Sequence, residues 1–356
     1  MSATPQIVFV CGREASYVRN AQIGRALAHY YATDLISGPP GGSLSLRLAR
    51  IVPRLIRRLR RPHDLVVVGF YGHPLLLLAR RLTRAPLLFD PFVSTFDTLV
   101  GDRGRIREGS LAARGLWQLD RLALHQATFN LSDTEAHAAY YAAAFGVPRH
   151  KIATLYLGCD ERHFTPRPAP QSNRFVVFTY STYLPLHGMD TVVEAARRCQ
   201  GYPIEFRLVG SSGPTFAATQ AHAHALGLDN VTFAPSVPFA ALPDAIAAAD
   251  MCLGGHFGTS PKSQRVIAGK TYQFIAMGKP VLLADNTANR ELFEADVSAA
   301  FCPPGDPDRL AQAILTLYRQ PDLRRTLAEN GLALYRKRLT WEILGAELMT
   351  YVQRLV

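Results

Sequence analysis

One stretch decides the fold of this 356-residue chain: positions 249–281 read ADMCLGGHFGTSPKSQRVIAGKTYQFIAMGKPV. Its first apolar run, 251–253, has the length and composition of a buried strand, and the glycines after it predict a loop. A short helical segment follows, and a second apolar strand begins at Pro280. A strand, a glycine-rich loop, a helix and another buried strand are typical of a parallel sheet that binds ligands at the carboxyl ends of its strands.

The same alternation of apolar runs and helical segments extends outward over the chain. In the first half, strands are predicted at 7–11, 34–36, 65–70, 86–89, 128–131 and 151–156, with helical segments near 20–31, 43–61, 74–82, 111–124 and 134–145. In the second half, strands are predicted at 175–179, 205–209, 231–233, 251–253, 280–284 and 300–302, each followed by a helical pattern. We therefore expect an α/β protein with two Rossmann-like, doubly wound parallel-sheet domains that face each other across a cleft.

A proline-rich polar stretch at 165–172 has the composition of an inter-domain linker. It separates a predicted N-terminal domain, 1–165, from a predicted C-terminal domain, 173–340. After Cys302 the chain shows only helical pattern, which is more than one doubly wound domain needs. We expect the last helix, 341–356, to pack back on the first domain.

The formal net charge of +11 and the isoelectric point of about 9.6 favour a partner rich in phosphate or an anionic surface. The loop after the first strand lacks GxGxxG, and no GxxxxGK[ST] occurs, so a dinucleotide site or a P-loop loses support. The five cysteines are scattered without a CxxC pair, which favours reduced, buried thiols over disulfides or zinc. A reducing cytoplasm is the simplest location.

Three cations follow the first strand of the deciding stretch: Lys262, Arg265 and Lys270. Cations beside a helix N-terminus can hold a diphosphate without a metal ion, because they supply the neutralising charge themselves. We therefore expect neither a metal nor another cofactor. The alternative is a flexible loop whose cations are solvated.

These segments resemble the nucleotide-sugar glycosyltransferases of the GT-B fold, and glycosyltransferase family 4 (group 1) most of all. The resemblance covers most of 128–356 and is weaker before that. As a set the motifs are fairly specific, although each alone is weak. They lie at 158–160 with Phe164, and at 183–190, 270–281, 289–292 and 303–310.

The resemblance implies a retaining transfer of a sugar from a nucleoside diphosphate sugar that is held by the second domain. The family usually has two glutamates eight positions apart at the donor site, and here Arg265 and Gln273 occupy these positions. Gln273 can still hydrogen-bond a ribose, and Glu291 and Gly188 complete the expected donor site. Arg265 and Lys270 are the expected catalytic cations for the leaving diphosphate.

On the first domain, Asp90 follows a predicted strand, roughly where many relatives have a histidine near the transferred sugar. We expect it to act in catalysis, with His73, Asp97 and Arg103 on the acceptor side. The alternatives are that the aspartates cap a turn and that His73 fills or caps a helix start. Arg19 borders the loop after the first strand. Two interpretations stay open: its side chain reaches the cleft, or it is solvated on the surface of a helix. The segment 132–137 opens a helix, which favours capping over metal binding.

Seven arginines and no acid lie between Arg47 and Arg61, and six of them fall on one side of a helix. Such a helix fits an anionic membrane surface that carries a lipid-linked acceptor, and it equally fits a crossover helix with solvated arginines. Nucleic acid is a weaker partner, since no aromatic-interleaved module is visible. Without a leader or an uncharged apolar span of about 18 residues, the expected location is the cytoplasm, at most on the inner membrane face.

The predicted partners are thus a nucleoside diphosphate sugar and a glycan or lipid-linked acceptor. Two other functions stay open on the sequence. One is a nucleotide-sugar epimerase of the same fold, which would release a changed sugar without an acceptor. The other is a non-catalytic binding or scaffold protein, since the usual acid pair is missing.

Overall fold

The computed structural model describes residues 4–170, 172–210 and 213–356, which form two compact units. Unit 1 comprises Met1–Gly158 and Trp341–Val356, and unit 2 comprises Cys159–Thr340. The chain therefore enters unit 2 at Cys159, ahead of the proline-rich stretch at 165–172. Residues of this earlier segment pack within unit 2: His163 stacks on Phe239 with ring centroids 4.6 Å apart. Residues 1–3 of the first predicted domain and Gln171 of the predicted linker lie outside the described residues.

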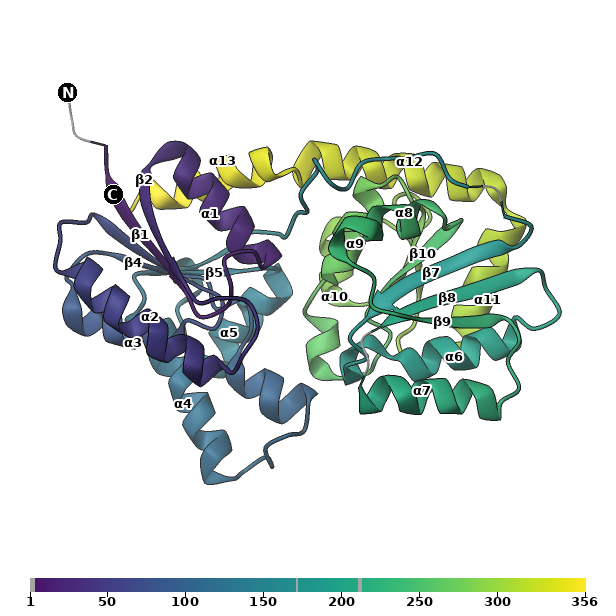
Figure 1. The fold of residues 1–356 in the computed structure, drawn as a ribbon, viewed down its shortest axis with the longest axis horizontal. Helices are drawn as coiled ribbons and strands as arrows, with labels where there is room; N and C mark the ends of the chain where they lie inside the picture. The colour runs from purple at the N-terminus through teal and green to yellow at the C-terminus, as the bar shows by residue number, and fades with distance from the viewer. Residues whose placement is uncertain (1–3, 171, 211–212) are drawn as a thin grey trace. The chain divides into compact units, whose positions relative to one another are not determined.

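Unit 1 is a six-stranded parallel sheet with strand order β2-β1-β3-β4-β5-β6 (Figure 1). Its strands are β1 (Gln6–Cys11), β2 (Ala32–Ser37), β3 (Leu65–Gly69), β4 (Leu87–Phe89), β5 (Phe129–Ser132) and β6 (Ile152–Thr154). Its helices are α1 (Val18–Tyr30), α2 (Leu44–Leu59), α3 (His73–Leu82), α4 (Leu111–Gln126), α5 (Glu135–Phe145) and α13 (Trp341–Val352), with a π-helical turn η1 (Asp97–Asp102) and a 3-10 turn η2 (Arg149–Lys151).

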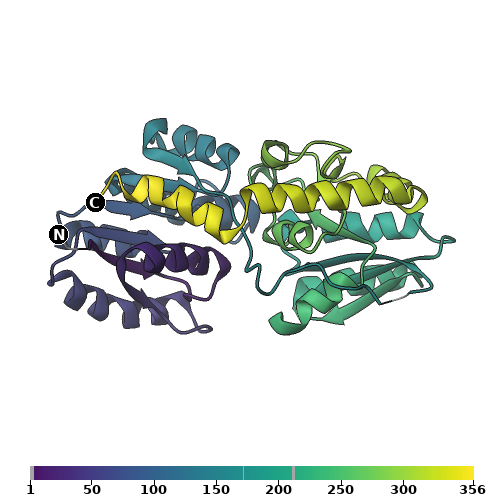
Figure 2. The same cartoon turned by 90° about the horizontal axis from the view of Figure 1, so that it is seen from above.

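Both faces of this sheet are covered, which is why its strands are nearly continuous apolar runs. Along β1, the side chains of Val8 and Val10 join the core formed with α2 to α5, whereas Ile7 and Phe9 join the core formed with α1 and α13. Helix α13 lies beside α1 (Figure 2). The C-terminal helix therefore completes one face of unit 1, as the sequence predicts.

Unit 2 is a second six-stranded parallel sheet, with strand order β12-β11-β10-β7-β8-β9. Its strands are β7 (Phe175–Ser181), β8 (Ile204–Gly210), β9 (Val231–Pro235), β10 (Met251–Gly255), β11 (Val281–Ala284) and β12 (Ala300–Cys302). Its helices are α6 (Met189–Arg198), α7 (Pro214–Ala225), α8 (Leu242–Ala247), α9 (Gly269–Ala276), α10 (Thr287–Leu292), α11 (Pro307–Arg319) and α12 (Pro321–Arg338). Short 3-10 turns are η3 (Pro185–His187), η4 (Phe239–Ala241) and η5 (Pro261–Gln264).

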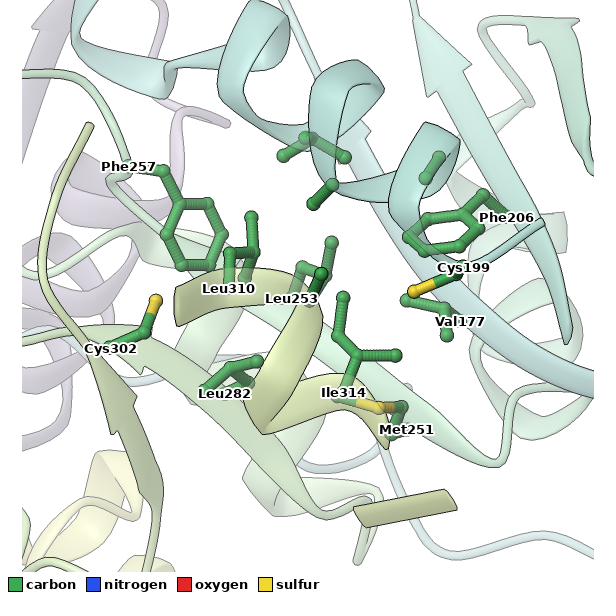
Figure 3. Close-up of a cluster of buried hydrophobic side chains, with 14 of the residues drawn as sticks. Val177, Cys199, Phe206, Met251, Leu253, Phe257, Leu282, Cys302, Leu310 and Ile314 are labelled. Carbon is green, nitrogen blue, oxygen red and sulfur yellow. The ribbon is translucent and has the colours of Figure 1, made fainter. Parts of the chain in front are cut away.

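The core of unit 2 fills one face of its sheet, where strand side chains meet helices α6 and α11 (Figure 3). Leu253 and Leu282 from the centre of the sheet pack there with Leu310 and Ile314 of α11, all fully buried. The strand order reverses between β7 and β10, so the loops after these two strands diverge to opposite faces. In doubly wound sheets this divergence leaves a ligand-binding crevice at the carboxyl ends of the strands.

The two parallel sheets and all twelve predicted strands are confirmed, with boundaries that differ by up to two residues. The five predicted helices of the first half are confirmed as well. The turn η1 has no counterpart in the sequence prediction. It forms because Asp120 on α4 accepts hydrogen bonds from the backbone N–H groups of Thr95 and Phe96, a contact between distant segments that periodicity does not encode.

Candidate functional site

The candidate site of unit 2 lies at the carboxyl ends of β7 and β10, at the reversal of strand order. The stretch 249–281 supplies β10, the loop after it and helix α9. β10 ends in Gly254 and Gly255, and a Cβ on Gly254 would lie 2.4 Å from Leu283 and 2.7 Å from the Thr271 hydroxyl. Glycine is therefore required where α9 packs against the strand end.

Lys270, in the first turn of α9, is the central cation of this site. Its side chain is 8% exposed, and its Nζ donates to the Thr179 hydroxyl at 2.8 Å and to the Tyr180 carbonyl at 3.2 Å. Both acceptors are neutral, and Lys270 forms no ion pair with any residue in the described ranges. Burial lowers the pKa of Lys270 from 10.5 to about 7.

Two histidines that the sequence analysis did not assign to the site lie beside this lysine. The rings of His187 and His256 stack with centroids 5.2 Å apart. Burial, together with the positive charges of Lys270 and Lys262, lowers the pKa of His187 to about 3. The same causes, together with His187, hold the pKa of His256 well below its usual range. Four basic groups therefore converge on one spot.

A backbone contact between two loops creates this cluster. The N–H of Gly258 donates to the Leu186 carbonyl at 3.0 Å, and the N–H of Phe257 donates to the His187 carbonyl at 3.3 Å. Gly188 adopts φ +63°, and a Cβ there would lie 2.3 Å from the Phe257 carbonyl carbon. Only glycine combines this backbone conformation with this close approach.

Lys262 and Arg265 come from the loop that follows. Lys262 is 7% exposed, and Ser263 beside it is fully buried and donates to the Gly258 carbonyl at 2.8 Å. Asn286 donates to the Ser263 carbonyl at 2.8 Å, which ties this loop to the start of α10. The predicted loop is thus anchored, and Arg265 lies half-buried at its end.

Gln273 faces the same site from the second turn of α9. Its side-chain carbonyl accepts a hydrogen bond from the Tyr180 hydroxyl, so its amide nitrogen keeps two donors for a ligand. Glu291 lies half-buried on α10. The structure therefore brings Lys262, Lys270, Gln273 and the Gly188 loop together.

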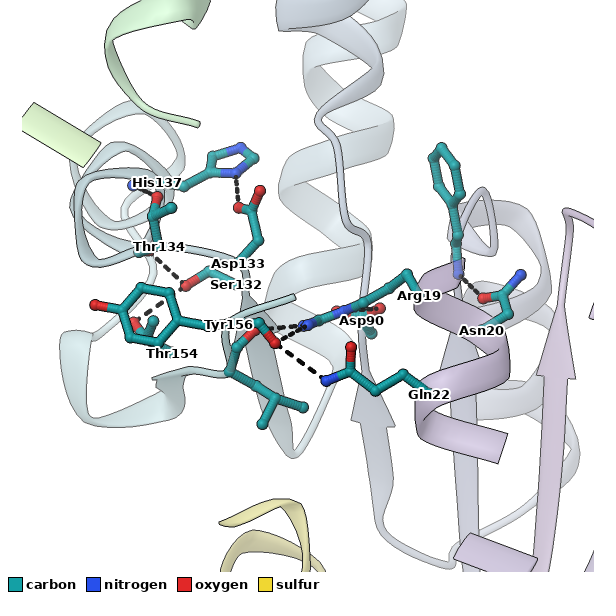
Figure 4. A network of polar contacts seen from close by, with 12 residues as sticks. Arg19, Asn20, Gln22, Asp90, Ser132, Asp133, Thr134, His137, Thr154 and Tyr156 are labelled. Carbon is teal, nitrogen blue, oxygen red and sulfur yellow. Dashed lines mark hydrogen bonds and ion pairs between the residues drawn. The ribbon is translucent and has the colours of Figure 1, made fainter. Parts of the chain in front are cut away.

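Asp90, predicted to act in catalysis, lies with Arg19 in a second polar cluster, at the carboxyl ends of β4 and β5 (Figure 4). Asp90 is fully buried, and Arg19 donates to both of its oxygens at 2.8–3.2 Å. Arg19 also donates to the Leu155 carbonyl at 2.5 Å. Burial raises the pKa of Asp90, and the Arg19 guanidinium opposes that rise. The Arg19–Asp90 pair therefore links the end of β4 to α1 and to the residue that follows β6.

Two of the other residues predicted for the acceptor side, His73 and Asp97, lie near Asp120, a buried aspartate that the sequence analysis did not single out. His73 is 1% exposed, its Nε2 lies 3.2 Å from Asp120 Oδ1, and burial lowers its pKa. Asp97 opens η1, and its N–H donates to the Ser94 hydroxyl, which in turn donates to Asp120. Arg103 lies half-buried just after η1.

Among the residues that the structure describes, no group of three or more histidine, cysteine or acidic side chains is arranged to hold a metal ion. All five cysteines are buried and free. Across the same residues, no helix combines the length and apolar character needed to cross a bilayer.

Comparison with known proteins agrees with this geometry. Residues 160–333 match the family "Glycosyl transferases group 1", and residues 6–158 match "Glycosyl transferase 4-like domain". Two similar solved structures are HepE of Anabaena in complex with UDP and glucose, and sucrose-phosphate synthase of Thermosynechococcus elongatus. HepE is 19% identical with a TM-score of 0.74 over 99% of this chain and 100% of its own. The synthase is 17% identical with a TM-score of 0.78 over 99% of each chain.

The fold is thus that of the two-domain GT-B glycosyltransferases. With both halves matched, the chain belongs to the group 1 glycosyltransferases. A curated relative, "Putative colanic acid biosynthesis glycosyltransferase WcaL" of Escherichia coli (strain K12), is 28% identical over 177 residues, 48% of this chain. The match spans 42% of that protein, less than half of its length.

Proposed function

We propose that this protein is a retaining transferase that moves a sugar from a nucleoside diphosphate sugar to a hydroxyl of a glycan or lipid-linked glycan. One observation carries the proposal. Lys270 is a buried ammonium with only neutral oxygen partners, at the end of the strands where a doubly wound sheet binds ligands. A buried charge without a counter-ion is costly unless a ligand supplies the opposite charge, and a diphosphate supplies it.

The chemistry follows from where charge develops. When the bond between the sugar and the diphosphate breaks, negative charge grows on the leaving phosphate, and fixed cations stabilise that state more than the ground state. Lys270 and Arg265 fill this role, with Lys262 and the positive end of the α9 helix dipole. In a front-face reaction the leaving phosphate accepts the proton of the attacking hydroxyl, and the anomeric configuration is retained without an enzymic nucleophile.

Several residues serve the rest of the donor. Gln273 presents amide N–H groups, which suit ribose hydroxyls. Gly188 lets the loop that carries His187 approach the Phe257 backbone, and Glu291 contributes to the sugar side. Because HepE was solved with UDP and glucose, UDP-glucose is the first donor to test.

The acceptor is assigned to unit 1. Asp90 holds Arg19 and the end of β6 in place, so its contribution to catalysis runs through that buried pair. His73, Asp97 and Arg103 lie on the segments that Asp120 organises, and we assign the acceptor side to these segments.

Location is part of the same proposal. We place the protein in the cytoplasm, with α2 on the inner membrane face. Three arginines of this helix bind within unit 1: Arg47 to Glu14, Arg54 to the Ser37 carbonyl and Arg58 to Asp34. Four exposed arginines form no ion pair within the described part of the chain and are available to anionic lipid: Arg50, Arg57, Arg60 and Arg61.

A panel of nucleoside diphosphate sugars, UDP-glucose among them, tests the function. We expect at least one donor to raise the melting temperature and to be hydrolysed slowly, with release of the nucleoside diphosphate. Lys270→Met should abolish both effects. Lys279→Met is the matched control, because Lys279 Nζ likewise donates to two neutral oxygens. These are the carbonyls of Ala247 and Ala249, away from the site.

The rival functions give different results in this experiment. Release of a changed sugar without an acceptor would indicate an epimerase. Binding of a donor without any turnover, with cellular function intact in Lys270→Ala and Arg265→Ala, would indicate a scaffold. No response of the folded protein to any donor would refute the transferase.

A further inference from the structure

A carboxylate and an imidazole form a buried pair on unit 1 that the proposed chemistry does not use. Asp133 follows β5, and His137 lies one turn further on, in α5; His137 Nδ1 is 2.6 Å from Asp133 Oδ1 (Figure 4). His137 is 1% exposed. Because the carboxylate accepts, Nδ1 carries the proton, and in the neutral ring Nε2 is a bare hydrogen-bond acceptor.

That acceptor is unused. His137 Nε2 is buried and has no hydrogen-bond partner among residues 4–170, 172–210 and 213–356. The neighbouring ring of Tyr141, with its centroid 4.4 Å away, ends in a hydroxyl that is equally buried and lacks a partner in the same ranges. Buried polar atoms are nearly always bonded, so two adjacent orphans indicate a place for a polar ligand.

The surroundings define the chemistry of that ligand. Burial raises the pKa of Tyr141 well above its usual value, and four nearby carboxylates raise it further: Asp133, Asp120, Asp90 and Asp97. Arg19, the cation paired with Asp90, directs its guanidinium at Asp90 and at the carbonyls of Leu155 and Tyr156. A phosphate or a carboxylate would meet like charges here, whereas a group that donates hydrogen bonds would meet acceptors.

We propose that Asp133, His137 and Tyr141 form an acceptor subsite, in which His137 Nε2 accepts a hydrogen bond from an uncharged sugar hydroxyl. The inference rests on the proposed transferase function and names its acceptor class: a neutral sugar is bound at this subsite, and a phosphorylated one is rejected. Asp133 is the positioning residue, because it fixes which ring nitrogen carries the proton. His137 and Tyr141 are the residues that contact the sugar.

Nitrogen NMR of the full chain labelled with ¹⁵N-histidine tests the subsite directly. We expect the His137 signals, assigned by their loss in His137→Asn, to show a protonated Nδ1 and a bare Nε2. Addition of methyl glycosides of glucose, galactose or mannose should shift the Nε2 signal, and methyl glucoside 6-phosphate should not. A proton on Nε2, or no shift with any neutral glycoside, would overturn the inference.

Two substitutions of His137 separate binding from structure. His137→Asn keeps a polar atom near the Nδ1 position and removes Nε2, whereas His137→Gln places an amide oxygen near the Nε2 position. With the donor from the panel and methyl glycosides as acceptors, His137→Asn should raise the acceptor KM about tenfold with little change in kcat. His137→Gln should return KM to within about threefold of the parent. An unchanged KM in His137→Asn would refute the subsite.

Tyr141→Phe keeps the test decisive if the histidine variants fold poorly. Its hydroxyl has no partner to lose in the described structure, so the melting temperature should stay within a few degrees while the acceptor KM rises. A lower melting temperature with an unchanged KM would show that the hydroxyl is structural. Titration with the donor panel separates the two proposals. If the parent protein binds no nucleoside diphosphate sugar, the transferase is refuted, whereas the NMR titration with glycosides alone still decides the subsite.

Discussion

The backbone N–H of Gly258 donates a 3.0 Å hydrogen bond to the carbonyl of Leu186. Together with the bond from the Phe257 N–H to the His187 carbonyl, this contact joins the two loops that carry His187 and His256. Gly188 makes the approach possible, since any larger residue would meet the Phe257 backbone. The candidate site of unit 2 therefore depends on a glycine that has no chemistry of its own.

Gly188→Ala should lower the free energy of unfolding by about 3 kcal/mol, because it combines a left-handed backbone with overpacking. It should also weaken UDP binding by separating the two histidine loops. Gly115→Ala on α4 is the control: no atom lies within 4 Å of a Cβ there, so it should be neutral or slightly stabilising. Urea denaturation and UDP titration measure both, and equal stability of the two variants would contradict the packing argument.

Binding of UDP should depend on pH through Lys270. Its pKa is about 7 before binding, and the diphosphate raises it, so the site takes up a proton as the ligand binds. Between pH 7 and 9, where the phosphates of UDP are fully ionised, the dissociation constant should rise with pH by up to about tenfold per unit. Calorimetry at pH 7, 8 and 9 measures it. Lys270→Gln should bind weakly with no such slope, and a flat profile of the parent protein would refute the assignment.

Removal of only one partner of the buried Arg19–Asp90 pair should destabilise the protein strongly. Asp90→Asn leaves the Arg19 guanidinium buried without its anion and should cost about 3–5 kcal/mol of stability. The double variant Arg19→Met with Asp90→Leu should cost less than the single one, because no uncompensated charge remains. Urea denaturation tests this, and a loss below about 1 kcal/mol in Asp90→Asn would show that the pair is not closed in solution.

The exposed arginines at the C-terminal end of α2 and just after it should bind anionic lipid. Arg57→Gln, Arg60→Gln and Arg61→Gln together should weaken binding to phosphatidylserine-containing vesicles about 100-fold at low salt, since each contributes about 1 kcal/mol near such a surface. Vesicle sedimentation measures the effect, which should fade as salt is added.

The control for this experiment removes the same charge from unit 2. Arg174, Arg336 and Lys337 are exposed, and their triple glutamine variant should bind vesicles as the parent does. Equal weakening in both triple variants would mean that net charge, and not α2, governs the attraction.

Much of the fold could be predicted because parallel strands buried on both faces leave a continuous apolar run, such as 65–70 or 280–284. The clustering of three residues proposed for the donor was predictable for a related reason. Lys262, Lys270 and Gln273 lie close together along the chain, so the loop and the helix that follow β10 bring them to one place.

The two histidines of the candidate site were missed because His187 and His256 are brought together by hydrogen bonds between distant loops. A single histidine in a sequence carries no sign of such a contact. The buried state of Asp90 was missed for the same reason, since its partner Arg19 lies on α1, 71 positions earlier. The glycines around His256 and Gly188 were the available signal, because they mark close backbone approach.

The placement of α13 has a consequence for dissection of the protein. Residues up to Gly158 and residues from Trp341 on make one unit, so a protease that cuts in the proline-rich stretch yields two fragments that do not correspond to the two units. The N-terminal fragment would lack the helix that covers Ile23 and Leu27, and its bare apolar face would favour aggregation. Separate production of unit 1 therefore calls for a circularly permuted gene that joins the last helix to the first strand.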